Sequence, residues 1–220
     1  QPLNGTCLSV DEAVEVAGRV GYPLMVRPSY VLGGRAMQIV YESDSLTKYV
    51  AEALSLSEGA PVLIDRFLSD AIEVDVDAIS DGHLTLVGGV MEHIEEAGIH
   101  SGDSTCFIPP QNVSIDILNQ VEEWTTIIGL ELGIRGCFNI QFAIHENLLY
   151  VLEVNPRGSR TFPFVAKSTG IPLARIAARV ALGERLSDLD IPQPQTDAVC
   201  VKAPVFPFIK LRGLDPAPGP

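Results

Sequence analysis

The sequence Phe138–Asn155, FNIQFAIHENLLYVLEVN, decides the fold. Two apolar-rich runs, 138–144 and 149–155, are joined by a short polar link, and this pattern predicts a β-hairpin. When the loop is centred on Asn147, Gln141 faces Glu153 across the two strands. The predicted hairpin therefore places an amide and a carboxylate side by side.

This register sorts the side chains of the hairpin into two faces, because successive side chains of a strand point to opposite sides of the sheet. The oxygen-bearing face is expected to hold Asn139, Gln141, Ala143, Val151, Glu153 and Asn155. The apolar face is expected to hold Phe138, Ile140, Phe142, Ile144, Tyr150, Leu152 and Val154. Moving the pairing by one residue would mix the two sets, so the hydrophobic pattern supports the register.

The oxygen-bearing face suits Mg²⁺, which prefers hard oxygen ligands and usually keeps water and substrate phosphates in its shell. Glu153 could bridge two ions, with Gln141 completing one shell and Asn155 the other. Arg157 and Arg160, just beyond the second strand, could contact a phosphoryl group during its transfer. A surface hairpin with a solvated polar face would show the same alternation, so this second interpretation stays open.

The composition is that of an ordinary globular protein with one or two lobes. The chain has 220 residues, of which 46% are hydrophobic and 20% charged. A net charge of −13 argues against nucleic acid as a partner, because such binding needs clustered Lys and Arg. No apolar run is long enough to span a membrane and the start carries no signal-peptide pattern, so we expect a cytoplasmic protein without a membrane partner.

The four cysteines are far apart in the sequence and form no CxxC pair, so they suggest neither a zinc site nor a disulfide framework. They are Cys7, Cys106, Cys137 and Cys200. Free thiols in a reducing compartment are the expected state.

Capping residues and periodicity divide the chain into two α/β lobes, 1–70 and 71–220. In the smaller lobe we expect helices from Ser9 to Val20 and Ser43 to Leu54, and strands at 23–26, 37–41 and 61–67. In the larger lobe we expect a strand pair at 72–80 and 84–91, helices at 114–132 and 172–182, and the hairpin. The first helix is expected almost at the start of the chain, and both ends are expected to be cuts through a longer chain.

Several positions outside the hairpin are candidates for nucleotide contacts. Gly33 and Gly34 lie between two predicted strands, where a flap could offer backbone N–H groups to phosphates, although a glycine pair there is often only a turn. Arg27 and Arg66 end two strands and could hold phosphates, or could be solvated rim residues. Glu73 could accept a hydrogen bond from a ribose hydroxyl, although its alternation with other acids also fits a solvent-facing strand.

The segment Gly98–Ser104, GIHSGDS, has few hydrophobic residues and many small polar ones, which favours a binding loop. His100 could act there as an acid, a base or a hydrogen-bond donor, or be merely exposed. No nucleophile-elbow sequence accompanies it, so a hydrolase triad is not indicated. The GxxxxGK[ST] phosphate loop is also missing from the sequence.

Taken together, three sets of strings closely resemble the large subunit of carbamoyl phosphate synthetase over nearly the whole chain. They are VRPSYVLGGR at 26–35, MEHI at 91–94 with GIHSGDS at 98–104, and NIQF at 139–142 with EVNPR at 153–157. That family duplicates an ATP-grasp module, and RPSYVLGGRAM is more similar to the second copy, which phosphorylates carbamate, than to the first. The resemblance implies an α+β fold in which two lobes with mostly antiparallel sheets clasp ATP.

The resemblance also implies a role for each matching residue. Phosphates would contact Arg27, Arg66 and the flap at Gly33 and Gly34; adenine would lie against the strand end through Leu68; ribose would bind Glu73; and Gly98, Ile99, His100 and Ser101 would line the nucleotide site. Two Mg²⁺ or Mn²⁺ ions would be held by Gln141, Glu153 and Asn155. Arg157 and Arg160 would steady carbamate and the transferred phosphoryl group.

The resemblance implies that the other regions of that family lie outside this sequence: the lobe before the module pair, the first synthetase half, the allosteric region and the glutaminase small subunit. The rest of the large subunit and the small subunit are therefore expected partners. Two other hypotheses stay open: a biotin-carboxylase-like ATP-grasp ligase, and a fragment that binds nucleotide without turning it over.

Overall fold

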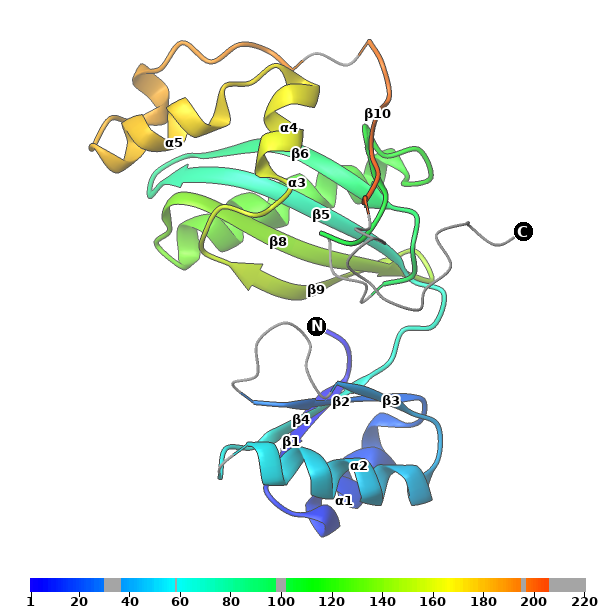
Figure 1. The fold of residues 1–220 in the computed structure, drawn as a ribbon. Coiled ribbons are helices and arrows are strands. Elements are labelled where there is room, and N and C mark those ends of the chain that lie inside the picture. Colours follow the sequence, from blue (N-terminus) through cyan, green and yellow to red (C-terminus); the bar gives the residue numbers. More distant parts are fainter. Residues whose placement is uncertain (30–36, 58, 98–101, 195–196, 206–220) are drawn as a thin grey trace.

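The computed structural model describes residues 1–29, 37–57, 59–97, 102–194 and 197–205 of the chain. These residues form two sheets, each with its own helices (Figure 1). The smaller sheet has one hydrophobic core, and the larger sheet has one on each face. Every strand pair in the described residues is antiparallel. The predicted α+β class with antiparallel sheets is confirmed.

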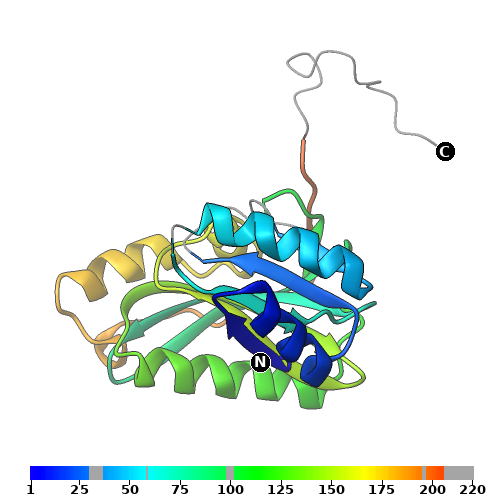
Figure 2. The ribbon, with the colours of Figure 1, turned by 90° about the horizontal axis from the view of Figure 1, so that it is seen from below.

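The smaller sheet has the strand order β1-β4-β2-β3. Its strands are β1 (Asn4–Cys7), β2 (Leu24–Pro28), β3 (Gln38–Val40) and β4 (Val62–Arg66). Helices α1 (Val10–Val20) and α2 (Ser43–Leu56) pack on one face of this sheet, and Figure 2 shows them side by side. The other face of the smaller sheet is turned toward the larger lobe (Figure 1).

Helix α1 begins where the sequence predicted. The Ser9 side chain accepts a hydrogen bond from the Glu12 backbone N–H, which is one of the free N–H groups at the helix start. The Glu12 side chain in turn accepts a hydrogen bond from the N–H of Leu8, the residue before the cap. Gly21 ends the helix with φ of 79°, a conformation that disfavours other residues. The expectation that the chain starts almost directly on this helix was wrong, because β1 precedes it and pairs with β4.

The larger sheet has the strand order β10-β7-β6-β5-β8-β9. Its strands are β5 (Ile72–Asp81), β6 (Thr85–His93), β7 (Cys106–Ile108), β8 (Arg135–His145), β9 (Leu148–Asn155) and β10 (Cys200–Lys202). A short link after β4 leads directly into β5, so the two lobes are joined where β5 begins (Figure 1). Strands β7 and β10 were not predicted, because they are only three residues long and their sequence pattern is too short to recognise.

Helices cover both faces of the larger sheet. Helix α3 (Ile115–Glu131) packs on the face that carries Val74, Phe138 and Phe142. Helices α4 (Phe162–Thr169) and α5 (Leu173–Ala181) pack on the opposite face, against Ile79 and Met91. A single-turn 3₁₀ helix, η1 (Leu186–Asp188), follows α5. Helix α4 was not predicted, because its eight residues include a proline in the first turn and a short, weakly amphipathic pattern.

The β8–β9 hairpin keeps the predicted register at its functional end and departs from it near the turn. Gln141 pairs with Glu153, and Asn139 pairs with Asn155. Closer to the turn, Phe142 pairs with Val151 and Ala143 with Tyr150, so a bulge displaces the pairing by one residue at Leu152. The expected faces of Val151 and Tyr150 were therefore wrong: Val151 packs in the α3 core, whereas Tyr150 pairs with a residue of the opposite face.

The turn explains the bulge. Glu146 and Asn147 both have positive φ, 50° and 61°, as a two-residue hairpin turn requires. A two-residue turn centred between these residues shifts the strand register by one relative to a loop centred on Asn147. One extra residue in β9 then restores the Gln141–Glu153 pairing.

Among the described residues, no helix is both long and apolar enough to cross a membrane. The four cysteines are free thiols, as predicted: Cys7 and Cys106 are buried, and Cys137 and Cys200 are half-buried.

Candidate active site

Two rows of polar side chains cross the face of the larger sheet that also carries α4 and α5. One row runs from Asp75 on β5 through Gln141 on β8 to Glu153 on β9. The next row has the same order of strands and contains Asp77, Asn139 and Asn155. The hairpin prediction found the two outer columns of these rows, which lie on β8 and β9. It did not find the inner column, the two aspartates on β5.

The rows run from the sheet interior toward solvent. Asp75 and Asp77 have no exposed surface, and Asn139 is buried. Gln141 and Asn155 are half-buried, and Glu153 is exposed. Of these six residues, only Gln141, Glu153 and Asn155 can therefore meet a ligand in this arrangement. Their one carboxylate and two amide oxygens fit a hard cation such as Mg²⁺.

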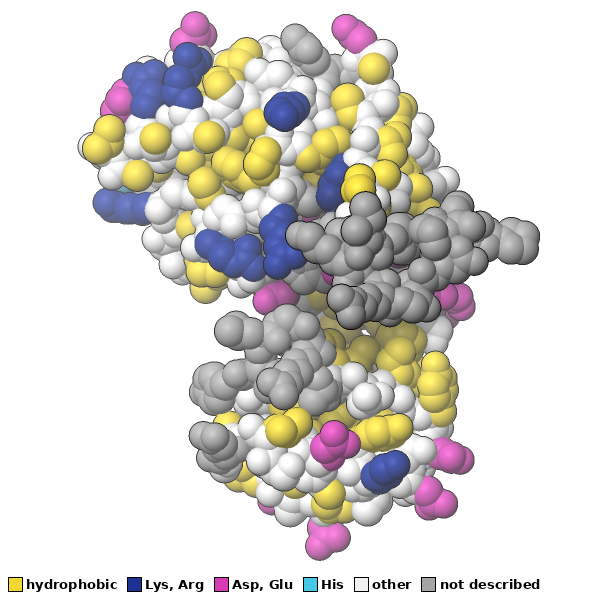
Figure 3. All heavy atoms as spheres, in the orientation of Figure 1, with side chains coloured by type: hydrophobic (Ala, Val, Ile, Leu, Met, Phe, Trp, Pro, Cys, Tyr) yellow, Lys and Arg dark blue, Asp and Glu magenta, His cyan; other side chains and the backbone are white. Residues whose placement is uncertain are grey.

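The two predicted phosphoryl-binding arginines follow β9 and are both exposed. The Arg157 backbone N–H donates to the Asn155 carbonyl at 2.8 Å, and its guanidinium donates to the Asn155 side-chain oxygen at 3.3 Å. Arg157 is thus held next to a candidate metal ligand, and Arg160 lies three residues further on. Figure 3 shows basic side chains gathered on the larger lobe, including its rim toward the smaller lobe.

Glu73 and Asp75 are buried in β5 on either side of the His93 ring of β6. Nδ1 of His93 lies 3.6 Å from a Glu73 oxygen, and Nε2 lies 3.6 Å from an Asp75 oxygen. Burial alone would lower the pKa of His93, but the two carboxylates, Asp75 first, raise it above its ordinary value. One carboxylate oxygen of each acid and one ring nitrogen of His93 lie within 4.8 Å of one another, close enough for the three residues to share a metal ion. Neither carboxylate oxygen of Asp75 has a hydrogen-bond donor in the described part of the chain.

The alternation of acids in β5 was open to a solvent-facing interpretation, and that interpretation is wrong. Glu73, Asp75 and Asp77 are 2%, 0% and 0% exposed. A strand pattern shows that alternate residues share a face but not what covers that face. Here β6 and β8 flank β5 and the helices α4 and α5 cover part of the sheet, so the acids lie inside.

The smaller lobe contributes three predicted nucleotide contacts, which the structure does not bring together. Arg27 lies on the sheet face opposite α1 and α2 and forms an ion pair with Asp65 at 2.7 Å. Burial raises the pKa of Asp65 above its ordinary value, and Arg27 opposes that rise. Arg66 pairs with Leu24, on the helix side of the sheet, and its guanidinium lies beside Gly21. Leu68 is half-buried in the link between the lobes.

Six predicted site residues lie outside the described residues: Gly33, Gly34, Gly98, Ile99, His100 and Ser101. The strands β2 and β3 on either side of the glycine pair are antiparallel neighbours, as a hairpin flap requires. The loop that contains Ser104 is linked to the sheet edge, because the Lys202 ammonium donates to the carbonyls of Gly102 and Ser104.

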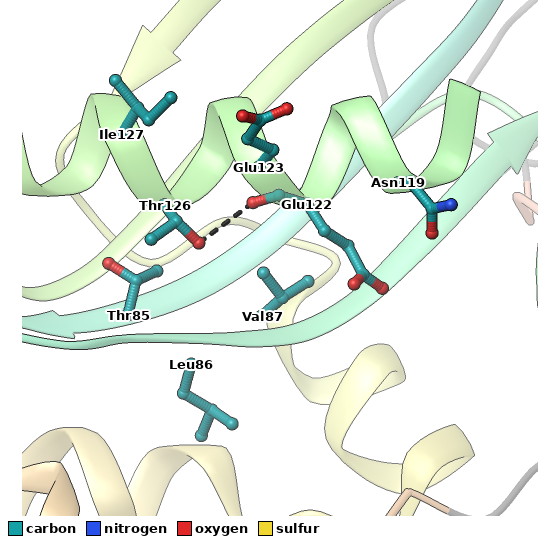
Figure 4. A pocket seen from close by; sticks show the side chains of 8 residues that line it. All are labelled: Thr85, Leu86, Val87, Asn119, Glu122, Glu123, Thr126 and Ile127. Atoms are coloured by element: carbon teal, nitrogen blue, oxygen red, sulfur yellow. Dashed lines mark hydrogen bonds between the residues drawn. The ribbon is translucent and has the colours of Figure 1, made fainter. Parts of the chain in front are cut away.

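A cavity of about 530 Å³ lies between β6 and α3, away from the polar rows. Figure 4 shows its lining, Thr85, Leu86, Val87, Asn119, Glu122, Glu123, Thr126 and Ile127. The Thr126 hydroxyl donates to the Glu122 carbonyl of its own helix, and none of the predicted site residues contributes to the lining. The cavity therefore belongs to the α3 layer and not to the candidate site.

The fold and the polar rows define a class of protein. The chain superimposes with a TM-score of 0.77 on the biotin carboxylase domain of Hydrogenobacter thermophilus 2-oxoglutarate carboxylase, a structure in complex with MgADP, ADP and bicarbonate. The match covers 90% of this chain and 44% of that chain, at 18% identity, which shows a shared fold. The chain has the ATP-grasp fold.

The sequence relationships are closer. Residues 3–189 match the family described as "Carbamoyl-phosphate synthase L chain, ATP binding domain". The chain is 56% identical over 219 residues to the carbamoyl phosphate synthase large chain of Methanospirillum hungatei. It is 51% identical over 231 residues to the carbamoyl phosphate synthase large chain, C-terminal section, of Methanocaldococcus jannaschii. This chain belongs to the carbamoyl-phosphate synthase large-chain ATP-binding family.

Both alignments cover 100% of this chain, but only 21% of the Methanospirillum protein and 37% of the Methanocaldococcus protein. The chain spans about a fifth of the length of several of the curated relatives that it matches.

Proposed function

We propose that this chain is the module that phosphorylates carbamate, taking carbamate and ATP to carbamoyl phosphate and ADP. The observation that carries the proposal is the pairing of Gln141 with Glu153 and of Asn139 with Asn155, with two arginines directly after β9. The assignment to the second module is supported by the RPSYVLGGRAM string and by the match to a relative named as a C-terminal section.

In this proposal, Gln141 and Glu153 would hold one Mg²⁺ or Mn²⁺, and Glu153 and Asn155 would hold the other. Bound divalent ions would neutralise phosphate charge. Arg157 and Arg160 contribute positive charge next to the transferred phosphoryl group. The protein supplies alignment and charge rather than a nucleophile, as phosphoryl transfer requires.

The nucleotide would lie between the lobes 1–70 and 71–220. Arg27, Arg66, Gly33 and Gly34 would contact phosphates, Leu68 adenine, and Glu73 ribose, with Gly98, Ile99, His100 and Ser101 completing the site. Glu73 is 2% exposed, so a ribose hydroxyl could reach its carboxylate only after some of the protein atoms that bury it had moved. The partners would be the rest of the large subunit and a glutaminase small subunit.

The test is ATP formation from ADP and carbamoyl phosphate with Mg²⁺, because this reverse step needs only the proposed site. Glu153→Gln removes the bridging charge and should lower the rate by at least about 100-fold. Glu131→Gln, the same change at an exposed position at the end of α3, is the matched control and should match the parent. Equal rates for the parent and Glu153→Gln would contradict the proposal.

A parent chain that binds Mg·ADP but forms no ATP would keep the nucleotide site and show that the activity needs the missing parts of the large subunit. The same assay with the full-length relative carrying the matching substitution would then decide the role of Glu153.

A further inference from the structure

We propose that Asp77 is a positioning residue that holds the loop carrying Arg157 and Arg160 in place beside the metal-binding strands. This inference rests on the proposed function for the part played by the arginines. The contacts of Asp77 themselves do not depend on it.

Asp77 joins three elements that are far apart in the sequence. Its Oδ1 accepts a hydrogen bond from the Asn139 amide of β8 at 3.2 Å, and its Oδ2 accepts one from the Thr161 hydroxyl at 2.8 Å. The same Asn139 amide donates to the Val76 carbonyl at 3.2 Å. Asn139 pairs with Asn155 of β9, so Asp77 connects the second polar row to the start of α4.

The residues around Thr161 tie the start of α4 together. The Ser159 side-chain oxygen accepts hydrogen bonds from the backbone N–H groups of Thr161 and Phe162, at 3.1 and 2.9 Å. The hydroxyls of Ser159 and Thr161 lie 2.8 Å apart. Ser159 therefore caps the start of this helix. Thr161, which contacts Ser159, connects the helix start to Asp77 through its hydroxyl.

The loop between β9 and α4 is consequently fixed at both ends. At the β9 end, Arg157 is hydrogen-bonded to Asn155 through its backbone and its side chain. At the α4 end, Arg160 lies in the sequence between Ser159 and Thr161. The hydroxyls of these two residues contact each other, and that of Thr161 donates to Asp77. A shift at Thr161 would move the backbone from which Arg160 extends.

Stability alone does not account for an acid at this position. Asp77 forms no ion pair among the described residues, and its hydrogen-bond donors are uncharged. A buried carboxylate with only neutral partners pays a desolvation penalty that an apolar residue would avoid. What the carboxylate provides is two acceptor oxygens that face Asn139 and Thr161 at once.

The experiment compares two threonines of the same helix. Thr161→Val removes the hydroxyl that bonds Asp77, whereas Thr169→Val removes a buried hydroxyl that donates to the Val165 carbonyl within α4. Both residues are buried, and valine has nearly the same shape as threonine. Thr161→Ser retains the hydroxyl and should behave as the parent.

Two quantities are measured: hydrogen exchange of the backbone amides at 157–162, and the affinities for Mg·ADP and for a Mg-bound non-hydrolysable ATP analogue. We expect Thr161→Val to raise exchange at 157–162 and to lower the affinity for the triphosphate about 10-fold while Mg·ADP binding stays within about 2-fold, because only the triphosphate has the group that the arginines contact. Thr169→Val should change neither quantity. In an Arg160→Ala background, Thr161→Val should cause no further loss of triphosphate affinity.

The positioning role of Asp77 is overturned if Thr161→Val leaves exchange at 157–162 equal to that of Thr169→Val. It is also overturned if the affinity losses of Thr161→Val and Arg160→Ala multiply independently. A parent that does not discriminate between the nucleotides, or an Arg160→Ala variant that binds the triphosphate as the parent does, would instead contradict the proposed function. The exchange measurement then still decides whether Asp77 holds the loop.

Discussion

The two faces of the larger sheet use opposite chemistry. On the α3 face, Val74, Val76, Phe138, Ile140 and Phe142 pack into a continuous apolar core. On the α4–α5 face, the same strands carry buried acids and amides that lead out to the exposed Glu153. The first face is apolar along all of these strands and stabilises the sheet by removing apolar surface from water. The second face combines an apolar part around Ile79 and Met91 with polar atoms held at fixed positions. Substitutions on the two faces should therefore affect different properties.

The largest effect on stability is expected from Phe138, which is fully buried on the α3 face and against which Gly129 of that helix packs. Phe138→Ala should lower the free energy of unfolding by about 3 to 5 kcal/mol, because it loses apolar contact and leaves a cavity. Urea denaturation measures the change. Leu182→Ala, at an 85% exposed position, is the control and should change little. A small effect of Phe138→Ala would mean that the α3 face is not the main source of stability.

The second prediction concerns pH and Asp77 on the opposite face. Burial raises the pKa of Asp77 from 3.8 to about 6, and the Asp75 charge adds to the rise, while hydrogen bonds from Ser159, Thr161 and Asn139 oppose it. Because the folded pKa is above the unfolded value, the folded state binds this proton more tightly. The stabilisation is complete below pH 3.8 and is lost as pH rises through about 6.

Asp77→Asn removes this titration. Its free energy of unfolding, minus that of the parent, should become more positive by about 2.4 kcal/mol between pH 4 and pH 7. Urea denaturation of both proteins across this range measures the difference. A difference that stays constant with pH would show that the pKa of Asp77 is not raised in the folded protein.

A smaller effect is expected at Gly88 of β6, where helix α5 comes close to the sheet. A Cβ at Gly88 would lie 2.8 Å from a Leu173 methyl group and 2.9 Å from the Asp77 carbonyl oxygen, which belongs to the backbone. Gly88→Ala should therefore lower the free energy of unfolding by about 1 to 3 kcal/mol. Gly18→Ala in α1 is the matched control, because it has open space and should stabilise by up to about 1 kcal/mol. Equal effects of the two changes would contradict the close approach of α5.

Much of the outer site could be predicted from sequence because side chains of a strand alternate between faces. The pairing of Gln141 with Glu153 follows from matching two apolar patterns. The position of the bulge at Leu152 could not be predicted, since it depends on the backbone conformation of the turn. The long helices were also predictable from their caps: Ser114 accepts a hydrogen bond from the Ile117 N–H at the start of α3, and Gly133 follows the helix end with φ of 60°.

The inner column of the site was harder to predict for a different reason. The alternating acids in β5 indicate that these residues share one face of the strand. The elements that bury this face, α4 and α5, come about 90 residues later in the chain. The contact from Asp77 to Thr161 spans 84 positions, and no local pattern indicates it.

The most direct test of the account is to count divalent ions at the β8–β9 strands by Mn²⁺ titration with ATP, followed by electron paramagnetic resonance. We expect two bound ions per chain in the parent and in Glu131→Gln, and loss of tight binding in Glu153→Gln, because Glu153 is the ligand proposed to be shared by both ions. The same number of ions bound with the same affinity in all three proteins would contradict the placement of the metal site on this face of the sheet.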